Sequence, residues 1–149
     1  MLKRDSSIKE KYNIGKFPFE NKIGLTFSEN QNLTIQQIAA WPNELDGMET
    51  FISKELEIEK KIHFNKGEIL FDKSVWRMEP LKWWLIGKTI NVPDSLGTSL
   101  ELSHAFTSIK ISGEKVRLLL NRHLPLDLRD DIFPINSSAS SAIHHVSVK

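Results

Sequence analysis

The hydrophobic pattern of the first half of the chain predicts one strand followed by one helix. Between positions 33 and 41, two-residue alternation puts Leu33, Ile35, Ala39 and Trp41 on one face, with Gln37 as the exception. After Pro42, apolar side chains recur at helical spacing and form one stripe: Leu45, Met48, Phe51, Ile52 and Leu56. Asn43 is expected to cap this helix, because its side chain can accept a hydrogen bond from a free backbone amide.

The second half predicts short strands, a second helix and a loop. Gly, Pro and Asp residues separate three short strands, expected at 68–71, 74–78 and 83–86. Two more strands are expected at 98–103 and 105–112, and a last one begins at 143. Ser112 is the expected cap of a helix whose stripe is Val116, Leu119 and Leu120, and Pro125 ends it. Residues 127–136 are expected to form a loop.

This order of elements favours an α+β fold, in which a mixed or antiparallel sheet carries two main helices on one face. Residues 1–22 show no period and are interpreted as a polar N-terminal arm. Residues 23–149 are predicted to be a single domain, because 149 residues fit one core and no internal repeat is visible.

Composition and charge narrow the classes of function. The chain has twenty Lys and Arg residues and nineteen Asp and Glu residues, which gives a net charge of +1. A charge this small produces no long-range field that would attract nucleic acid or a membrane surface. The chain contains no cysteine, which excludes disulfides, thiolate metal sites and thiol catalysis and suits a reducing compartment. No apolar run is long enough to cross a membrane, and no secretory signal is recognisable. We therefore predict a cytoplasmic protein that binds neither nucleic acid nor membrane.

Three groups of residues could carry chemistry, and each has a plainer explanation. His144 and His145 are adjacent, and neighbours on a strand point to opposite faces, so the pair is not expected to share a metal ion. The acidic cluster at Asp127, Asp130 and Asp131 lies in a loop, where aspartate commonly bonds its own backbone. Ser103 and His104 lack the sharp turn that exposes a catalytic serine. We predict no catalytic, cofactor-binding or metal-ligating residue.

Four tryptophans are the remaining unusual feature: Trp41, Trp76, Trp83 and Trp84. Aromatic side chains stack on nucleic-acid bases, so an RNA-associated module is one alternative, but Lys82 and Lys88 do not make a basic groove. Core positions and anchors at a subunit interface are the favoured interpretation, because tryptophan is enriched at interface hot spots.

The segment from Glu101 to Pro134 resembles the gamma subunit of heterotetrameric sarcosine oxidase, a relative of the folate-dependent aminomethyltransferases. Leu102-Ser103-His104 is similar to a family "D-x-S-H/D" element, with Glu101 in place of aspartate. Residues 109–120, IKISGEKVRLLL, are similar to "L-x-L-S-G-x-x-A-x-x-L-L", with valine at 116 where alanine is common. Residues 124–128 and 133–134 are similar to "C-P-L-D-L…F-P", and residues 78–87 resemble "G-P-D-E-W-L".

The resemblance implies the fold of the folate-binding domain of the aminomethyltransferase superfamily and a non-catalytic, accessory role. The complex would oxidise sarcosine to glycine and pass a one-carbon unit to tetrahydrofolate. Its alpha, beta and delta subunits would be the partners and would hold FAD, FMN, NAD and zinc, with none of these in this chain. Family members run some tens of residues further, so the domain is expected to be short at its C-terminus.

The resemblance also selects candidate motif and interface residues: Trp83, Trp84, Ser103, Gly113, Leu119, Pro125, Asp127, Leu128, Phe133 and Pro134. One alternative uses the same ancestry, namely a stand-alone folate-binding or aminomethyltransferase-like protein. Whether the chain is itself an enzyme is left open by the sequence.

Overall fold

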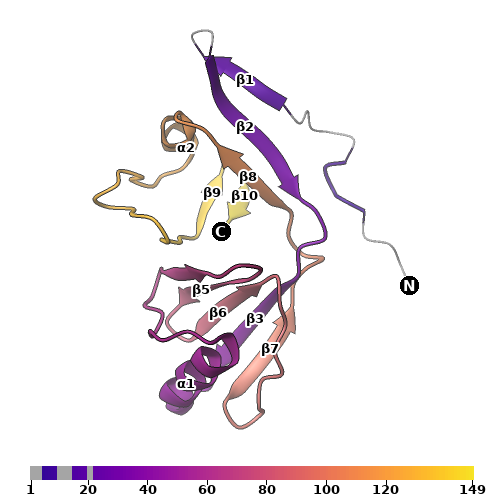
Figure 1. Cartoon of the computed structure of the whole chain (residues 1–149), viewed down its shortest axis with the longest axis vertical. Helices are drawn as coiled ribbons and strands as arrows, with labels where there is room; N and C mark the ends of the chain where they lie inside the picture. The colour runs from indigo at the N-terminus through magenta and orange to yellow at the C-terminus, as the bar shows by residue number, and fades with distance from the viewer. Residues whose placement is uncertain (1–4, 10–14, 20–21) are drawn as a thin grey trace. The chain divides into compact units, whose positions relative to one another are not determined.

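The structure is a computed structural model that describes residues 5–9, 15–19 and 22–149. The chain divides into two compact units, shown in Figure 1. The first unit comprises Met1–Leu33, His104–Pro134 and Ser141–Val148, and the second comprises Thr34–Ser103, Ile135–Ser140 and Lys149. The predicted α+β class is confirmed, with two α-helices and antiparallel sheets in the described residues. The predicted single domain over 23–149 stays a prediction.

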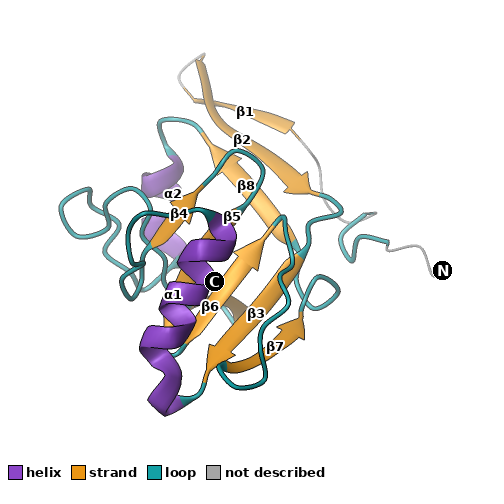
Figure 2. Ribbon diagram, turned by 60° about the horizontal axis from the view of Figure 1, so that its bottom comes forward, coloured by secondary structure: helices purple, strands orange, loops and turns teal. Residues whose placement is uncertain are grey.

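The second unit is built on a five-stranded antiparallel sheet with the order β4-β5-β6-β3-β7. Its strands are β3 (Ile35–Ala40), β4 (Gly67–Ile69), β5 (Ser74–Glu79), β6 (Lys82–Ile86) and β7 (Gly97–Glu101). A short 3-10 helix η1 (Pro42–Glu44) leads directly into α1 (Leu45–Leu56). Figure 2 shows α1 lying across one face of this sheet. All these strands and α1 were predicted, with ends that differ by a few residues.

The core of the second unit lies between α1 and the sheet. Met48, Ile52 and Leu56 come from the apolar stripe of α1 and are almost fully buried. They pack against side chains that alternate along the strands: Ile38, Ala40, Val75, Trp83 and Leu85. Burying an apolar side chain of this size contributes about 1.5–3 kcal/mol. The helical period therefore produces the contribution of α1, whereas β3 packs Ile38 and Ala40 into this core and not the predicted face of Ile35 and Ala39, so that part of the prediction is wrong.

The opposite face of the sheet carries the two other tryptophans of the region. The strand register puts Trp76 beside Trp84, and Trp84 beside Gln37. The indole nitrogen of Trp84 donates to the side-chain oxygen of Gln37 at 3.3 Å. The Trp76 ring lies over Gly67, where an added Cβ would meet it at 2.2 Å. A larger residue at position 67 would therefore displace this ring.

The first unit contains two small sheets and one helix. β1 (Gly15–Phe19), β2 (Lys22–Asn30) and β8 (Ser108–Ser112) form a three-stranded antiparallel sheet in the order β1-β2-β8. α2 (Val116–His123) follows β8, and β9 (Ser141–Ile143) pairs with β10 (Val146–Val148) in a hairpin. β1 and β2 were not predicted, because residues 15–30 show no clean alternation of apolar and polar residues. Part of the predicted arm, 1–4, 10–14 and 20–21, lies outside the described residues.

Both predicted helix caps are wrong. Neither α1 nor α2 has a side-chain cap hydrogen bond, and their first flanking residues are Glu44 and Lys115. Asn43 lies inside η1, which already shapes the entry to α1. Ser112 stays in β8, where it pairs with Thr26 of β2.

Gly113 separates β8 from α2 for a steric reason. Its φ is +124°, a conformation that only glycine adopts readily. An added Cβ would also lie 2.3 Å from the carbonyl oxygen of Gly24. Close packing at the strand-to-helix transition therefore requires glycine at this position.

Candidate functional site

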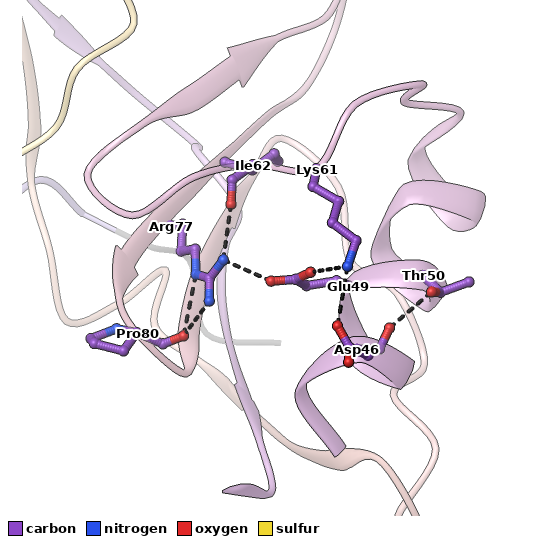
Figure 3. A network of polar contacts seen from close by, with 7 residues as sticks. All are labelled: Asp46, Glu49, Thr50, Lys61, Ile62, Arg77 and Pro80. Carbon is purple, nitrogen blue, oxygen red and sulfur yellow. Dashed lines mark hydrogen bonds and ion pairs between the residues drawn. The ribbon is translucent and has the colours of Figure 1, made fainter. Parts of the chain in front are cut away.

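A largely buried ion pair lies beside the core of the second unit. Glu49 extends from α1 and Arg77 from β5, with side chains only 9% and 12% exposed. An Arg77 Nη1 donates to Glu49 Oε1 at 2.7 Å, and Figure 3 shows the contact. The Arg77 guanidinium also lies 5.0 Å from the centre of a Trp83 ring, within the range of a cation–π interaction.

Arg77 links three segments of the chain through this one side chain. Besides Glu49, it donates to the carbonyl of Ile62 at 3.2 Å and to that of Pro80 at 2.6 Å. It thus connects α1, the segment after α1 and the turn between β5 and β6, as Figure 3 shows. A buried N–H of Arg77 without an acceptor would cost about 1–3 kcal/mol of stability, so these hydrogen bonds avoid that loss.

The outer part of the network is exposed to solvent. Lys61 Nζ lies 2.8 Å from Glu49 and 3.1 Å from Asp46. The hydrogen bond to Glu49, followed by that to Asp46, raises the pKa of Lys61 above its ordinary value. Exposed ion pairs of this kind contribute little to stability because water screens them.

The contacts of this network connect segments of the fold, and the space beside it is too small for a substrate. A hollow beside it is lined by Glu49, Ile52, Ser53, Ile62 and Trp83 and offers about 10 Å³ to a water-sized sphere. That is about the room one water molecule needs. The pair was not predicted from the sequence, although Glu49 occupies a position on the apolar stripe of α1, four residues after Leu45. A charged residue inside such a stripe signals a buried partner.

Three of the predicted residues lie in the second unit and make structural contacts. Ser103 is 8% exposed, and its hydroxyl accepts the amide of Ile35 at 2.9 Å. It follows β7 in a turn, so the predicted strand through 103 ends earlier, at Glu101. Trp83 is 1% exposed in the core, and Trp84 is 8% exposed on the other face of the sheet. An interface role for the two tryptophans stays a prediction.

The loop after α2 is held by Arg117, in the first unit. Arg117 Nη1 donates to the carbonyl oxygens of Leu128 and Phe133, and Nη2 pairs with Asp130. The amide of Leu128 donates to the side chain of Asn121, also on α2, at 3.3 Å. The predicted residues Leu128 and Phe133 therefore converge on one helix side chain.

Replacing Arg117 with alanine is expected to release this loop while leaving α2 folded. The variant loses the donors for two carbonyls, so amide hydrogens of residues 127–133 should exchange at least about tenfold faster, a change of about 1.4 kcal/mol in the free energy of opening. Hydrogen exchange followed by mass spectrometry measures this. Arg122→Ala on the same helix is the matched control and should leave the loop unchanged; equal exchange in both variants would contradict the role of Arg117.

The other predicted residues of the first unit lie around this loop. Asp127 is held by its neighbour Arg129, whose Nη2 lies 2.6 Å from Asp127 Oδ2. That side-chain hydrogen bond lowers the pKa of Asp127 below its ordinary value. Leu119 is half-buried on α2, and Pro125 and Pro134 are exposed at the two ends of the loop. Asp127 Oδ1 also accepts the backbone amide of Arg129 at 3.1 Å, so the expectation that an aspartate in this loop bonds the local backbone is confirmed for Asp127.

The histidine pair lies in a turn, so the strand argument made for it is wrong. His144 and His145 connect β9 to β10, and His144 has a φ of +52°. The His144 ring centre lies 6.3 Å from that of His123 and 6.2 Å from that of His145. Within the described residues, no group of three or more His, Cys, Asp or Glu side chains is arranged to hold a metal ion. The absence of a metal ligand stays a prediction.

Comparison with known proteins finds a likeness among solved structures. No protein-family model matches the chain, and no curated protein matches it. Among solved structures, the fold is similar to a chain of the heterotetrameric sarcosine oxidase from Corynebacterium sp. U-96 in complex with pyrrole 2-carboxylate. The match has 18% sequence identity and a TM-score of 0.61, and it covers 83% of this chain and 68% of that chain. At this identity the likeness establishes a shared fold.

Proposed function

We propose that this chain is a non-catalytic subunit, of the gamma type, in a heterotetrameric oxidoreductase related to sarcosine oxidase. The observation that carries the proposal is the fold likeness, which extends over 83% of the chain. The resemblance of residues 101–134 to the gamma-subunit motifs supports it independently, because it rests on sequence alone.

The contacts of the motif residues support an accessory role. The Ser103 hydroxyl accepts a backbone amide, and the carbonyls of Leu128 and Phe133 accept Arg117. Gly113 sits where a side chain would collide with backbone. These residues build the two units, and a family signature made of such residues marks ancestry without placing chemistry in this chain.

The proposal assigns the chemistry to partner chains. Alpha, beta and delta subunits are the proposed partners, with FAD, FMN, NAD and zinc bound in them, and the complex would be cytoplasmic. Among the described residues, no helix has the length and apolar character that crossing a bilayer requires. The even balance of charges gives no reason to add nucleic acid to the partners.

The isolated chain provides the first test. Purified alone and supplied with sarcosine and oxygen, it should produce no hydrogen peroxide, whereas turnover by the isolated chain would contradict an accessory role. Calorimetry with tetrahydrofolate tests the alternative of a stand-alone folate-binding protein. Binding with a Kd near about 1 μM, or about −8 kcal/mol, would favour that alternative.

A further inference from the structure

Three histidine rings lie close together in the first unit. His123 is the last residue of α2, and His144 and His145 form the turn between β9 and β10. The ring centre of His144 lies 6.3 Å from that of His123 and 6.2 Å from that of His145. All three residues belong to the same compact unit, so these separations do not involve the second unit.

The turn removes the reason for expecting no metal ion at this pair. That expectation assumed a strand, in which neighbouring side chains point to opposite faces. In the turn, the ring of His144 instead lies near that of His123, which comes from α2. His144 also has a φ of +52°, a conformation for which glycine and asparagine are the usual residues of a hairpin turn. Residues held in such uncommon conformations gather at functional sites.

The spacing of the His123 and His144 rings fits two ligands of one ion. A zinc ion lies about 2.0–2.1 Å from an imidazole nitrogen and hence about 3.2 Å from the ring centre. Two rings on one ion therefore have centres about 5.2 Å apart at a tetrahedral angle and about 6.4 Å apart at most. The observed 6.3 Å lies within that limit. Side-chain rotations that bring the two rings about 1 Å closer give the tetrahedral arrangement.

The surroundings of the two rings suit a cation. Among the described residues, neither ring makes a hydrogen bond or an ion pair that would occupy its nitrogens. His123 ends α2, and the carbonyl groups at the C-terminus of a helix favour a positive charge nearby. Imidazole suits zinc, copper and nickel, whereas magnesium and calcium prefer oxygen ligands.

We propose that His123 and His144 together bind one divalent transition-metal ion of the class that prefers imidazole, namely zinc, copper or nickel. Water fills the other coordination positions, because no group of three or more His, Cys, Asp or Glu side chains among the described residues is arranged to hold a metal ion. The proposal concerns this chain alone and does not depend on the proposed function.

Such an ion would tie the β9–β10 hairpin to the end of α2. Each strand of the hairpin has only three residues, and neither pairs with any other strand in the described part of the chain. A two-stranded hairpin by itself is marginally stable in water. A metal bridge between the turn and the helix therefore restricts the opening of the hairpin.

Titration calorimetry of the full chain with zinc chloride tests the site, and the wild type should bind one ion per chain. His123→Gln and His144→Asn should each weaken binding at least about tenfold, because each removes one of the two protein ligands. Asparagine tolerates a left-handed backbone, so the turn should keep its conformation in His144→Asn. His104→Gln, in the same unit, is the matched control and should bind zinc like the wild type.

The opening of the hairpin gives a second measurement. An ion that binds only the closed arrangement stabilises it by mass action. With zinc at about 100 times its Kd, amide hydrogens of residues 141–148 should exchange up to about a hundredfold more slowly in the wild type. The same zinc concentration should leave their exchange unchanged in His144→Asn. Hydrogen exchange followed by mass spectrometry measures both.

Each outcome decides the proposal. Weaker binding in both His123→Gln and His144→Asn, with zinc-dependent slowing of exchange only in the wild type, supports it. A wild type that binds none of zinc, copper and nickel overturns it, as does binding that either variant leaves unchanged. Equal loss of binding in His145→Gln and His123→Gln would assign the ion to another set of ligands and also overturn it. None of these results concerns partner subunits, so a failure here leaves the proposed function standing.

Discussion

Replacing Arg77 with methionine is expected to lower the free energy of unfolding by about 3 kcal/mol, because the Glu49 carboxylate stays buried without its main partner. Removing one partner of a buried ion pair leaves an uncompensated charge, which costs about 3–5 kcal/mol. The lower end applies because Lys61 remains 2.8 Å from Glu49. The variant also loses the donors to Ile62 and Pro80 and the contact with Trp83.

Urea denaturation followed by circular dichroism measures this change. The double variant Glu49→Met/Arg77→Met is the decisive control, since replacing both charges by apolar groups removes the unpaired carboxylate and should recover part of the loss. Lys61→Ala, at the exposed end of the network, should have a much smaller effect. A double variant no more stable than Arg77→Met alone would show that the buried carboxylate is not the cause.

Replacing Trp83 with alanine is expected to cost about 3–5 kcal/mol, the range for deleting a large aromatic side chain from a core. Trp83 is 1% exposed and lies among Ile38, Met48 and Leu85 in the core of the second unit. This cost exceeds the free energy of transferring the tryptophan side chain from water to an apolar environment, because the surrounding side chains cannot completely fill the cavity that it leaves. A loss of this size takes a large share of the stability of a typical domain.

Trp41→Ala is the matched control for this prediction. Trp41 is 46% exposed and donates its indole N–H to the carbonyl of Asp94 at 2.8 Å. Its replacement should cost about 1 kcal/mol, the typical value for one hydrogen bond. Equal midpoints in urea for the two variants would mean that Trp83 does not belong to the core and would favour an interface role for it instead.

The sequence predicts the elements of the second unit well because turn residues separate short apolar segments and because α1 has one apolar stripe, which its packing uses fully. The strands do not alternate cleanly: β6 places Trp83, Trp84, Leu85 and Ile86 in succession. The stripe therefore identifies the buried face of α1, whereas the pattern of the strands predicts their existence better than the face they bury. The α+β class follows from these elements alone.

The first unit was predicted less well, for reasons that are local. β1 and β2 pair over a bulge between Phe17 and Pro18, which breaks the alternation that would reveal a strand. Ser112 is a residue type that often caps a helix, but here it is the last residue of β8. The change of chain direction before α2 occurs at Gly113, which has a positive φ. His144 and His145 form a two-residue turn. The apolar residues on both sides of this turn led to the prediction of one continuous strand.

The buried charges escaped prediction because pairing is a tertiary property. Glu49 and Arg77 lie 28 residues apart in the sequence, and only the packing of α1 on β5 brings them together. Arg117 likewise meets Leu128 and Phe133 only after the loop folds back onto α2. Periodicity identifies which face an element buries, whereas the partner of a polar group on that face depends on the packing.

Affinity purification of the tagged chain from its native host, with the flavin absorbance and partner masses of the eluate measured together, tests the central proposal most directly. The account predicts that the chain elutes with larger flavin-bearing subunits and that the eluate oxidises sarcosine or a related N-methyl amine. The same tag on an unrelated protein controls for carry-over. Recovery of the chain alone, colourless and without any flavoprotein, would contradict the proposed role.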